Sequence, residues 1–122
     1  DVPQALNSLK GKICGFWFPT DNVIASAAAT VAKVAAEAKL PVVASDSALV
    51  RAGSLASISV DYYELGRMTG AMGADILEDK KTPGEIPVGF QTAQKPFINL
   101  KVAQSIGLEL PQALLERSNV QK

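Results

Sequence analysis

The sequence predicts an α/β fold in which a parallel sheet is flanked by helices, and two observations support this. Apolar runs typical of buried strands alternate with segments whose apolar residues recur every three or four positions. Three of these runs are followed by a short polar turn and then a helical segment, which is the order of a parallel βαβ arrangement. With 122 residues, the chain is long enough for one hydrophobic core.

The clearest strand is the first half of the stretch Ile13 to Ile24, which reads I-C-G-F-W-F-P-T-D-N-V-I. Its apolar residues run without alternation up to Phe18, as expected for a strand buried on both faces of a parallel sheet. We therefore expect Trp17 in the core, and Cys14 to behave there as a small hydrophobic side chain.

The other elements follow from periodicity and from Pro and Gly at their ends. In chain order, the predicted helices cover residues 3–9, 23–39, 47–53, 62–78, 100–106 and 111–117, and the predicted extended segments cover residues 13–18, 41–46, 55–60, 86–90 and 96–100. The fourth helix contains Gly66, Gly70 and Gly73. Each glycine costs about 1 kcal/mol relative to alanine, so we expect another segment to approach this helix closely.

Charge and composition exclude several functions. Twelve basic and twelve acidic residues cancel, which argues against nucleic acid or an anionic membrane as a partner. With one cysteine and no histidine, metal clusters, histidine-based triads and an internal disulfide are excluded, and we expect no cofactor and no metal. The chain opens on Asp1 and not on methionine, so we expect a piece of a longer protein.

Three aspartates follow three successive predicted strands: Asp21, Asp46 and Asp61. The carboxyl ends of parallel strands share one edge of a sheet, where ligands bind, so we expect these carboxylates to converge on one crevice. The predicted ligand-binding residues are Thr20, Asp21, Asn22, Asp46, Ser47, Asp61 and Tyr62. Such a crevice suits a small ligand that carries an amine or several hydroxyls.

A purely structural role is the alternative for each of these residues. Asp and Ser after strands are common helix caps, and we expect Ser47 to cap the short helix that follows it. Tyr62 and Tyr63 open a helix beside the proposed crevice, where either ring contacts a ligand or remains a partly exposed boundary residue.

Four motifs carry a resemblance to a known family. F-P-T-D-N-V at Phe18 to Val23, L-P-V-V-A-S-D at Leu40 to Asp46, V-D-Y-Y-E-L-G at Val60 to Gly66 and N-L-K-V-A-Q-S-I-G-L-E-L-P at Asn99 to Pro111 closely resemble ABC-transporter substrate-binding proteins. The branch is the one with tryptophan- and phenylalanine-binding members. The match runs in order over nearly the whole chain, with one departure at Cys14, where relatives often carry aspartate.

The resemblance implies a type I periplasmic-binding-protein fold, in which two flavodoxin-like α/β lobes close over a ligand at a hinge. Residues 1–57 and 86–117 would belong mainly to the second lobe, and the helix over residues 62–78 would belong to the first. The implied function is extracytoplasmic solute binding without catalysis, in the periplasm or as a lipoprotein. The implied partners are an amino acid, aromatic among the candidates, and an ABC permease.

Two alternative functions remain open. The same module serves as the ligand-sensing domain of a signalling receptor, and neighbouring kinase or cyclase domains would identify that role. An α/β enzyme is disfavoured because the predicted crevice offers carboxylates without a nucleophile, a histidine or a phosphate loop. We also expect this chain either to pack the helix over residues 62–78 against its own strands or to bury it by pairing with a second copy as a homodimer, because an unpaired strand edge is a template for another chain.

Overall fold

The computed structural model describes residues 2–91 and 95–122. The chain divides into two compact units, which we name the sheet unit, Asp1–Ser59 with Lys95–Lys122, and the helix unit, Val60–Gln94. These bounds group residues 86–91 with the helix unit, whereas the resemblance placed them with the second lobe. The assignment of residues 1–57, 62–78 and 86–117 to lobes of a larger protein stays a prediction.

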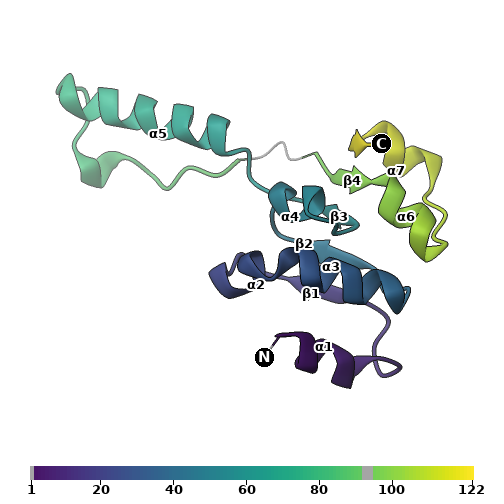
Figure 1. The fold of residues 1–122 in the computed structure, drawn as a ribbon. Helices are drawn as coiled ribbons and strands as arrows, with labels where there is room; N and C mark the ends of the chain where they lie inside the picture. Colours follow the sequence, from purple (N-terminus) through teal and green to yellow (C-terminus); the bar gives the residue numbers. More distant parts are fainter. Residues whose placement is uncertain (1, 92–94) are drawn as a thin grey trace. The chain divides into compact units, whose positions relative to one another are not determined.

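The sheet unit contains a five-stranded sheet in the order β1-β2-β3-β4-β5 (Figure 1). Its strands are β1 (Phe16–Phe18), β2 (Val42–Ala44), β3 (Ala56–Ser57), β4 (Phe97–Asn99) and β5 (Asn119–Gln121). The predicted α/β class with a helix-flanked sheet is confirmed, with one correction. Neighbouring strands are parallel except β3 and β4, which are antiparallel, so the sheet is mixed. The chain leaves the sheet after β3, forms the helix unit, and returns as β4.

The helices of the sheet unit lie close to their predicted positions, with one interruption. They are α1 (Val2–Leu9), α2 (Asn22–Ser26), α3 (Ala28–Glu37), α4 (Ser47–Arg51), α6 (Leu100–Ile106) and α7 (Gln112–Glu116). The single helix predicted over residues 23–39 is two helices that meet at Ala27, where φ is −99° and ψ is 3°. Backbone hydrogen bonds continue into and out of Ala27, so the chain bends there without losing its helical bonding.

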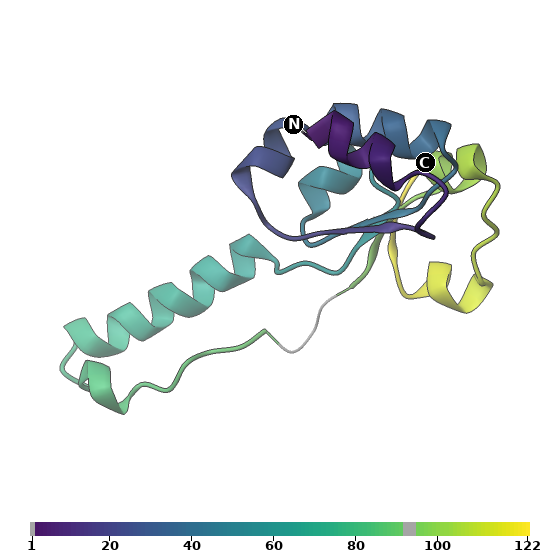
Figure 2. The ribbon, with the colours of Figure 1, turned by 90° about the horizontal axis from the view of Figure 1, so that it is seen from below.

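The main core of the sheet unit lies between β1 and β2 and the helices that cover them. Its buried side chains are Leu6, Phe18, Val31, Ala35 and Val42. They come from α1, α3 and the two strands, and α1 and α3 lie side by side over one face of the sheet (Figure 2). A second cluster, Leu55, Ala103 and Ile106, packs α6 against the chain next to β3.

The opposite face of β1 and β2 is open to solvent, which corrects the prediction of a strand buried on both faces. Trp17 is 67% exposed and its β2 neighbour Val43 is 42% exposed, whereas Phe18 and Ala44 are buried. Cys14 precedes the strand and is also exposed, so it is not a core residue. An uninterrupted apolar run therefore identified the strand correctly without revealing that only one of its faces is covered.

The helix unit consists of α5 (Tyr62–Leu77), the 3₁₀ turn η1 (Pro83–Glu85) and an extended return over residues 86–91 that runs back along α5 (Figures 1 and 2). One side of α5 carries an apolar stripe that is half-buried: Leu65, Met68, Met72 and Ile76. The return segment supplies part of the cover, because the terminal methyl groups of Met68 and Met72 lie beside Gly89. No residue of α5 is fully buried.

The three glycines of α5 do not mark a close approach in this chain. Among the described residues, nothing lies within 4 Å of a Cβ built on Gly66, Gly70 or Gly73, apart from the helix itself. The prediction that another segment packs tightly against them is therefore wrong for this chain, because the return segment covers a different face of α5.

Candidate ligand-binding site

The loops after β1 and β2 are held side by side. The hydroxyl oxygens of Thr20 and Ser45 are 2.9 Å apart and share a hydrogen bond, and the backbone N–H of Ser45 donates to the carbonyl of Phe18 at 2.9 Å. Because β1 and β2 are parallel and in register from Phe16 to Phe18, their carboxyl ends lie at one edge of the sheet. Two of the predicted strand ends therefore meet as expected.

Each of the three predicted aspartates caps a helix. Asp21 Oδ1 accepts hydrogen bonds from the N–H groups of Val23 and Ile24 at 2.8 and 3.0 Å. Asp46 Oδ1 accepts from Ala48 N–H at 2.6 Å. These aspartates therefore cap helices, which is the structural role expected from the sequence as the alternative to ligand binding. Capping satisfies N–H groups that the first turn of a helix leaves unpaired.

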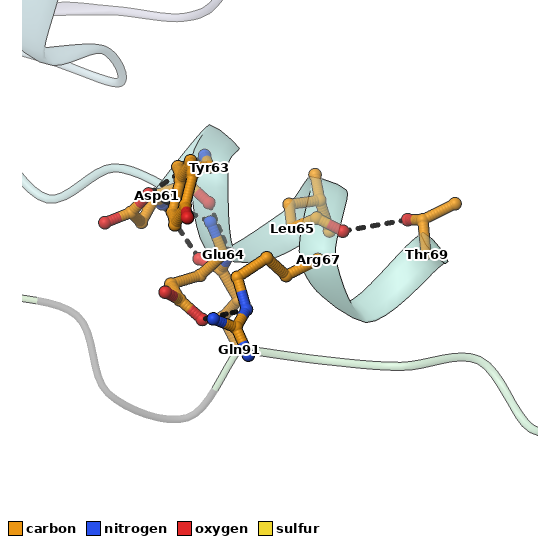
Figure 3. Close-up of polar contacts among 7 residues, drawn as sticks. All are labelled: Asp61, Tyr63, Glu64, Leu65, Arg67, Thr69 and Gln91. Atoms are coloured by element: carbon orange, nitrogen blue, oxygen red, sulfur yellow. Dashed lines mark hydrogen bonds and ion pairs between the residues drawn. The ribbon is translucent and has the colours of Figure 1, made fainter. Parts of the chain in front are cut away.

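Asp61 has the same role at the start of α5. Its Oδ1 accepts from the N–H groups of Tyr63 and Glu64 at 3.0 and 3.1 Å (Figure 3). In all three aspartates one carboxylate oxygen makes every hydrogen bond to the helix, and Oδ2 accepts none from the described residues. A carboxylate offers about four acceptor positions, so capping leaves each aspartate able to accept a charged donor such as an ammonium group.

The remaining predicted residues of the sheet unit are less constrained. Asn22 is the exposed first residue of α2, and its backbone carbonyl accepts from Ser26 Oγ at 2.7 Å. Ser47 does not cap α4, because Asp46 takes that position and Ser47 becomes the first helical residue. Its hydroxyl accepts instead from Arg51 Nη2 at 3.2 Å.

Two polar residues near these positions were not predicted from the sequence. The Arg51 guanidinium bonds Ser47 and lies 5.1 Å from the centre of the Phe97 ring, which places a fixed positive charge beside the loop after β2. Gln91 bonds the backbone of Asp61. Ser47 and Arg51 are four residues apart on α4, a spacing at which helical side chains meet. The contacts of Arg51 with Phe97 and of Gln91 with Asp61 join residues far apart in sequence, and no local motif indicates those partners.

Asp61 and Tyr62 belong to the helix unit, whereas Asp21 and Asp46 belong to the sheet unit. Convergence of all three carboxylates on one crevice therefore stays a prediction. Tyr62 and Tyr63 are 60% and 72% exposed, so neither ring is committed to a core. Within residues 2–91 and 95–122, no group of three acidic, cysteine or histidine side chains is arranged to hold a metal ion. No helix in the same residues has the length and apolar character needed to cross a membrane.

Comparison with known proteins gives one curated relative and several similar structures. The relative is a tyrosine-binding protein of Clostridioides difficile (strain R20291), 38% identical over 109 residues, which are 89% of this chain and 31% of that protein. A ligand-free, open substrate binding protein with adhesive properties from Clostridium difficile matches with a TM-score of 0.81 and 35% identity. That match covers 99% of this chain and 40% of the other.

Two further structures are equally similar. A conserved domain protein from Vibrio cholerae has a TM-score of 0.84 and 33% identity, over 100% of this chain and 41% of that one. The third is the complex of an ABC domain with L-Trp from Streptococcus pneumonia, with a TM-score of 0.83 and 32% identity, over 98% of this chain and 40% of that one. The chain thus spans about a third to two fifths of the length of these relatives.

A family model matches the chain over residues 1–122, and its description is ABC transporter substrate binding protein. That description and the names of the relatives specify binding and not a reaction. The match over the full sequence, together with the shared fold, makes this chain a member of the ABC transporter substrate binding protein family.

Proposed function

We propose that the protein to which this chain belongs is the extracytoplasmic solute-binding component of an ABC transporter, and that it binds an amino acid, most favourably an aromatic one. The observation that supports the ligand class most directly is the pair of relatives that bind tyrosine and L-Trp at 38% and 32% identity. Delivery to a membrane permease, and residence in the periplasm or as a lipoprotein, are parts of the same proposal.

The proposed ligand site comprises Thr20, Asp21, Asn22, Asp46, Ser47, Asp61 and Tyr62, in a cleft between two lobes. An amino-acid zwitterion needs an acceptor for its ammonium group and donors for its carboxylate. The uncommitted Oδ2 atoms supply acceptors, and the hydroxyl pair of Thr20 and Ser45 supplies a donor at 2.9 Å separation. A charge-assisted hydrogen bond contributes about 1.5 to 3 kcal/mol, so loss of one contact is measurable.

The test is calorimetric titration of the complete natural protein with L-Tyr, L-Trp, L-Phe and L-Leu. We expect at least one aromatic amino acid to bind more tightly than L-Leu. Copurified small molecules identified by mass spectrometry give an independent answer. A protein that binds none of the four, and that copurifies with a ligand lacking an amino group, would contradict the proposed ligand class.

Substitutions at Asp21 separate binding from capping. Asp21→Ala removes both roles, whereas Asp21→Ser keeps a good helix cap and removes the carboxylate. If Asp21 contacts the ligand, both variants weaken binding by about tenfold or more, because each loses a charged contact. If it only caps α2, Asp21→Ser binds normally. Asp79→Asn is the matched control, because Asp79 has φ +54°, which asparagine tolerates, and lies outside the proposed site.

The competing role as a ligand-sensing receptor domain makes the same prediction for ligand affinity but a different one for partners. A transporter component should associate with a permease when the complete protein is reconstituted with membranes of its own cell. A kinase or cyclase domain on the same polypeptide would instead favour the receptor. Pairing of two copies of this chain also stays a prediction, which light scattering tests.

A further inference from the structure

The side chain of Gln91 makes two hydrogen bonds to the backbone of Asp61, 30 residues away in sequence (Figure 3). We call this pair of hydrogen bonds the grip of Gln91. Gln91 Oε1 accepts from Asp61 N–H at 2.9 Å, and Gln91 Nε2 donates to the Asp61 carbonyl at 2.6 Å. The two bonds fix the orientation of the amide, because the reversed orientation would set donor against donor and acceptor against acceptor. A single side chain thus pairs with Asp61 much as a neighbouring β-strand would.

With this contact, Asp61 makes more hydrogen bonds than either of the other two capping aspartates. Its N–H is held by Gln91, its carbonyl by Gln91 and by Leu65 N–H at 2.9 Å, and its Oδ1 by the first turn of α5. Among the described residues, only Oδ2 accepts no hydrogen bond. Asp21 and Asp46 cap their helices in the same way, but no side chain in residues 2–91 and 95–122 bonds their backbone.

We propose that Gln91 is a positioning residue for ligand capture: it holds Asp61 so that Oδ2 is presented in one direction to the ammonium group of an amino acid. This rests on the proposed function. An acceptor that is already fixed loses less conformational freedom when the ligand binds, so the same hydrogen bond gives tighter binding.

Two variants of Gln91 in the complete natural protein test the proposal. Gln91→Ala removes the grip, and Gln91→Glu keeps the shape but replaces the donor to the Asp61 carbonyl with an acceptor. Both should weaken binding of the preferred aromatic amino acid by about fivefold or more. Gln112→Ala is the matched control, because among the residues that the structure describes the Gln112 amide bonds Glu116 on α7 and no other side chain. Affinities of both Gln91 variants within twofold of the natural protein would overturn the proposal.

A double-mutant cycle separates positioning from a general structural role. Asp61→Asn keeps a helix cap and the backbone grip but removes the charged acceptor. If Gln91 acts through that acceptor, Gln91→Ala has little further effect on affinity in the Asp61→Asn background. An equal loss in both backgrounds would overturn the proposal, because it would show that Gln91 acts elsewhere.

Hydrogen exchange at the Asp61 amide tests the Gln91 contact in the absence of ligand. Gln91→Ala should accelerate that exchange by roughly tenfold, because it removes the acceptor of this N–H. Unchanged exchange would overturn the grip itself. If the natural protein binds none of the tested amino acids, the proposed function fails, and the role of Gln91 in ligand capture is overturned with it. Accelerated exchange of the Asp61 amide in Gln91→Ala would still show that the two hydrogen bonds form.

Discussion

The sheet unit and the helix unit use the same kinds of apolar side chain but bury them to different extents. In the sheet unit, α3 covers the sheet and buries Val31 and Ala35 to 1% and 2% exposure. In the helix unit, α5 is longer and also amphipathic, yet its stripe is only half-buried and Leu77 is 86% exposed. The difference shows that an apolar stripe builds a core only where a second layer covers it.

The largest expected effect compares two isoleucines. Ile98 on β4 is 1% exposed, whereas Ile76 on α5 is half-buried. Ile98→Ala in the 122-residue chain should lower the free energy of unfolding by about 2 to 5 kcal/mol, through lost burial and a cavity. Ile76→Ala should cost about 1 kcal/mol or less, since the half-buried Ile76 side chain has less buried apolar area to lose.

Urea unfolding monitored by circular dichroism measures both changes. Equal losses for the two variants would break the comparison, because they would mean that α5 is as well covered as the sheet.

Local signals explain which parts of the fold could be predicted from the sequence. The helix at Leu100–Ile106 was predicted at its observed bounds, because Gly107 closes it with φ +75°, a conformation that glycine adopts readily. In contrast, β5 was missed, since N-V-Q has no apolar run and becomes a strand only by pairing with β4. The antiparallel pairing of β3 with β4 likewise depends on where the chain returns from the helix unit.

The candidate site likewise has features that could be predicted from the sequence and features that could not. The capping aspartates could be predicted because an aspartate before a helix bonds N–H groups two and three residues ahead. The grip of Gln91 on Asp61 and the hydroxyl pair of Thr20 and Ser45 could not, since 30 and 25 residues separate the partners. The exposure of Trp17 was mispredicted for a related reason: the residues of β1 do not determine whether another layer covers its second face.

A pair of glycines sharpens the comparison with a smaller effect. Gly53 in the sheet unit has φ +118°, and a Cβ there would lie 2.7 Å from Ala32 Cβ, so Gly53→Ala is both strained and crowded. Gly70 on α5 is helical with open space around it. We expect Gly53→Ala to destabilise the chain by roughly 1 to 3 kcal/mol and Gly70→Ala to stabilise α5 by up to about 1 kcal/mol.

Thermal unfolding of the two variants, with hydrogen exchange of α5 amides, measures these opposite signs. A lower melting temperature for Gly70→Ala would show that something packs against this face of α5 after all, for example a second copy of the chain.

The smallest expected effect is a loss of order in the helix unit at acid pH. Lys81 Nζ bonds Asp75 Oδ2 at 2.8 Å, and this bond holds the pKa of Asp75 below its ordinary value of 3.8. The Thr82 N–H donates to Glu85 Oε2 at 2.8 Å, and this bond holds the pKa of Glu85 below its ordinary value of 4.5. Both interactions close the turn between α5 and the return segment.

The sign follows from proton linkage. Because the folded pKa of each carboxyl is lower than its unfolded pKa, the unfolded chain binds more protons in this range. The stabilisation is therefore fully present above the ordinary pKa values, and it is lost as pH falls through the folded ones. Glu85 is exposed and Asp75 is partly exposed to solvent, so the effect is small and weakens further with added salt.

NMR titration of the two carboxyls in the 122-residue chain tests this prediction. Lys81→Met should raise the pKa of Asp75 toward its ordinary value and leave that of Glu85 unchanged, since Glu85 is held by Thr82. Lys101→Met, which removes an exposed lysine from α6, should move neither pKa. If Lys81→Met leaves the pKa of Asp75 unchanged, the ion pair does not persist in solution, and the turn of the helix unit is held without it by the Thr82–Glu85 contact and by backbone bonds to the Asp75 carbonyl.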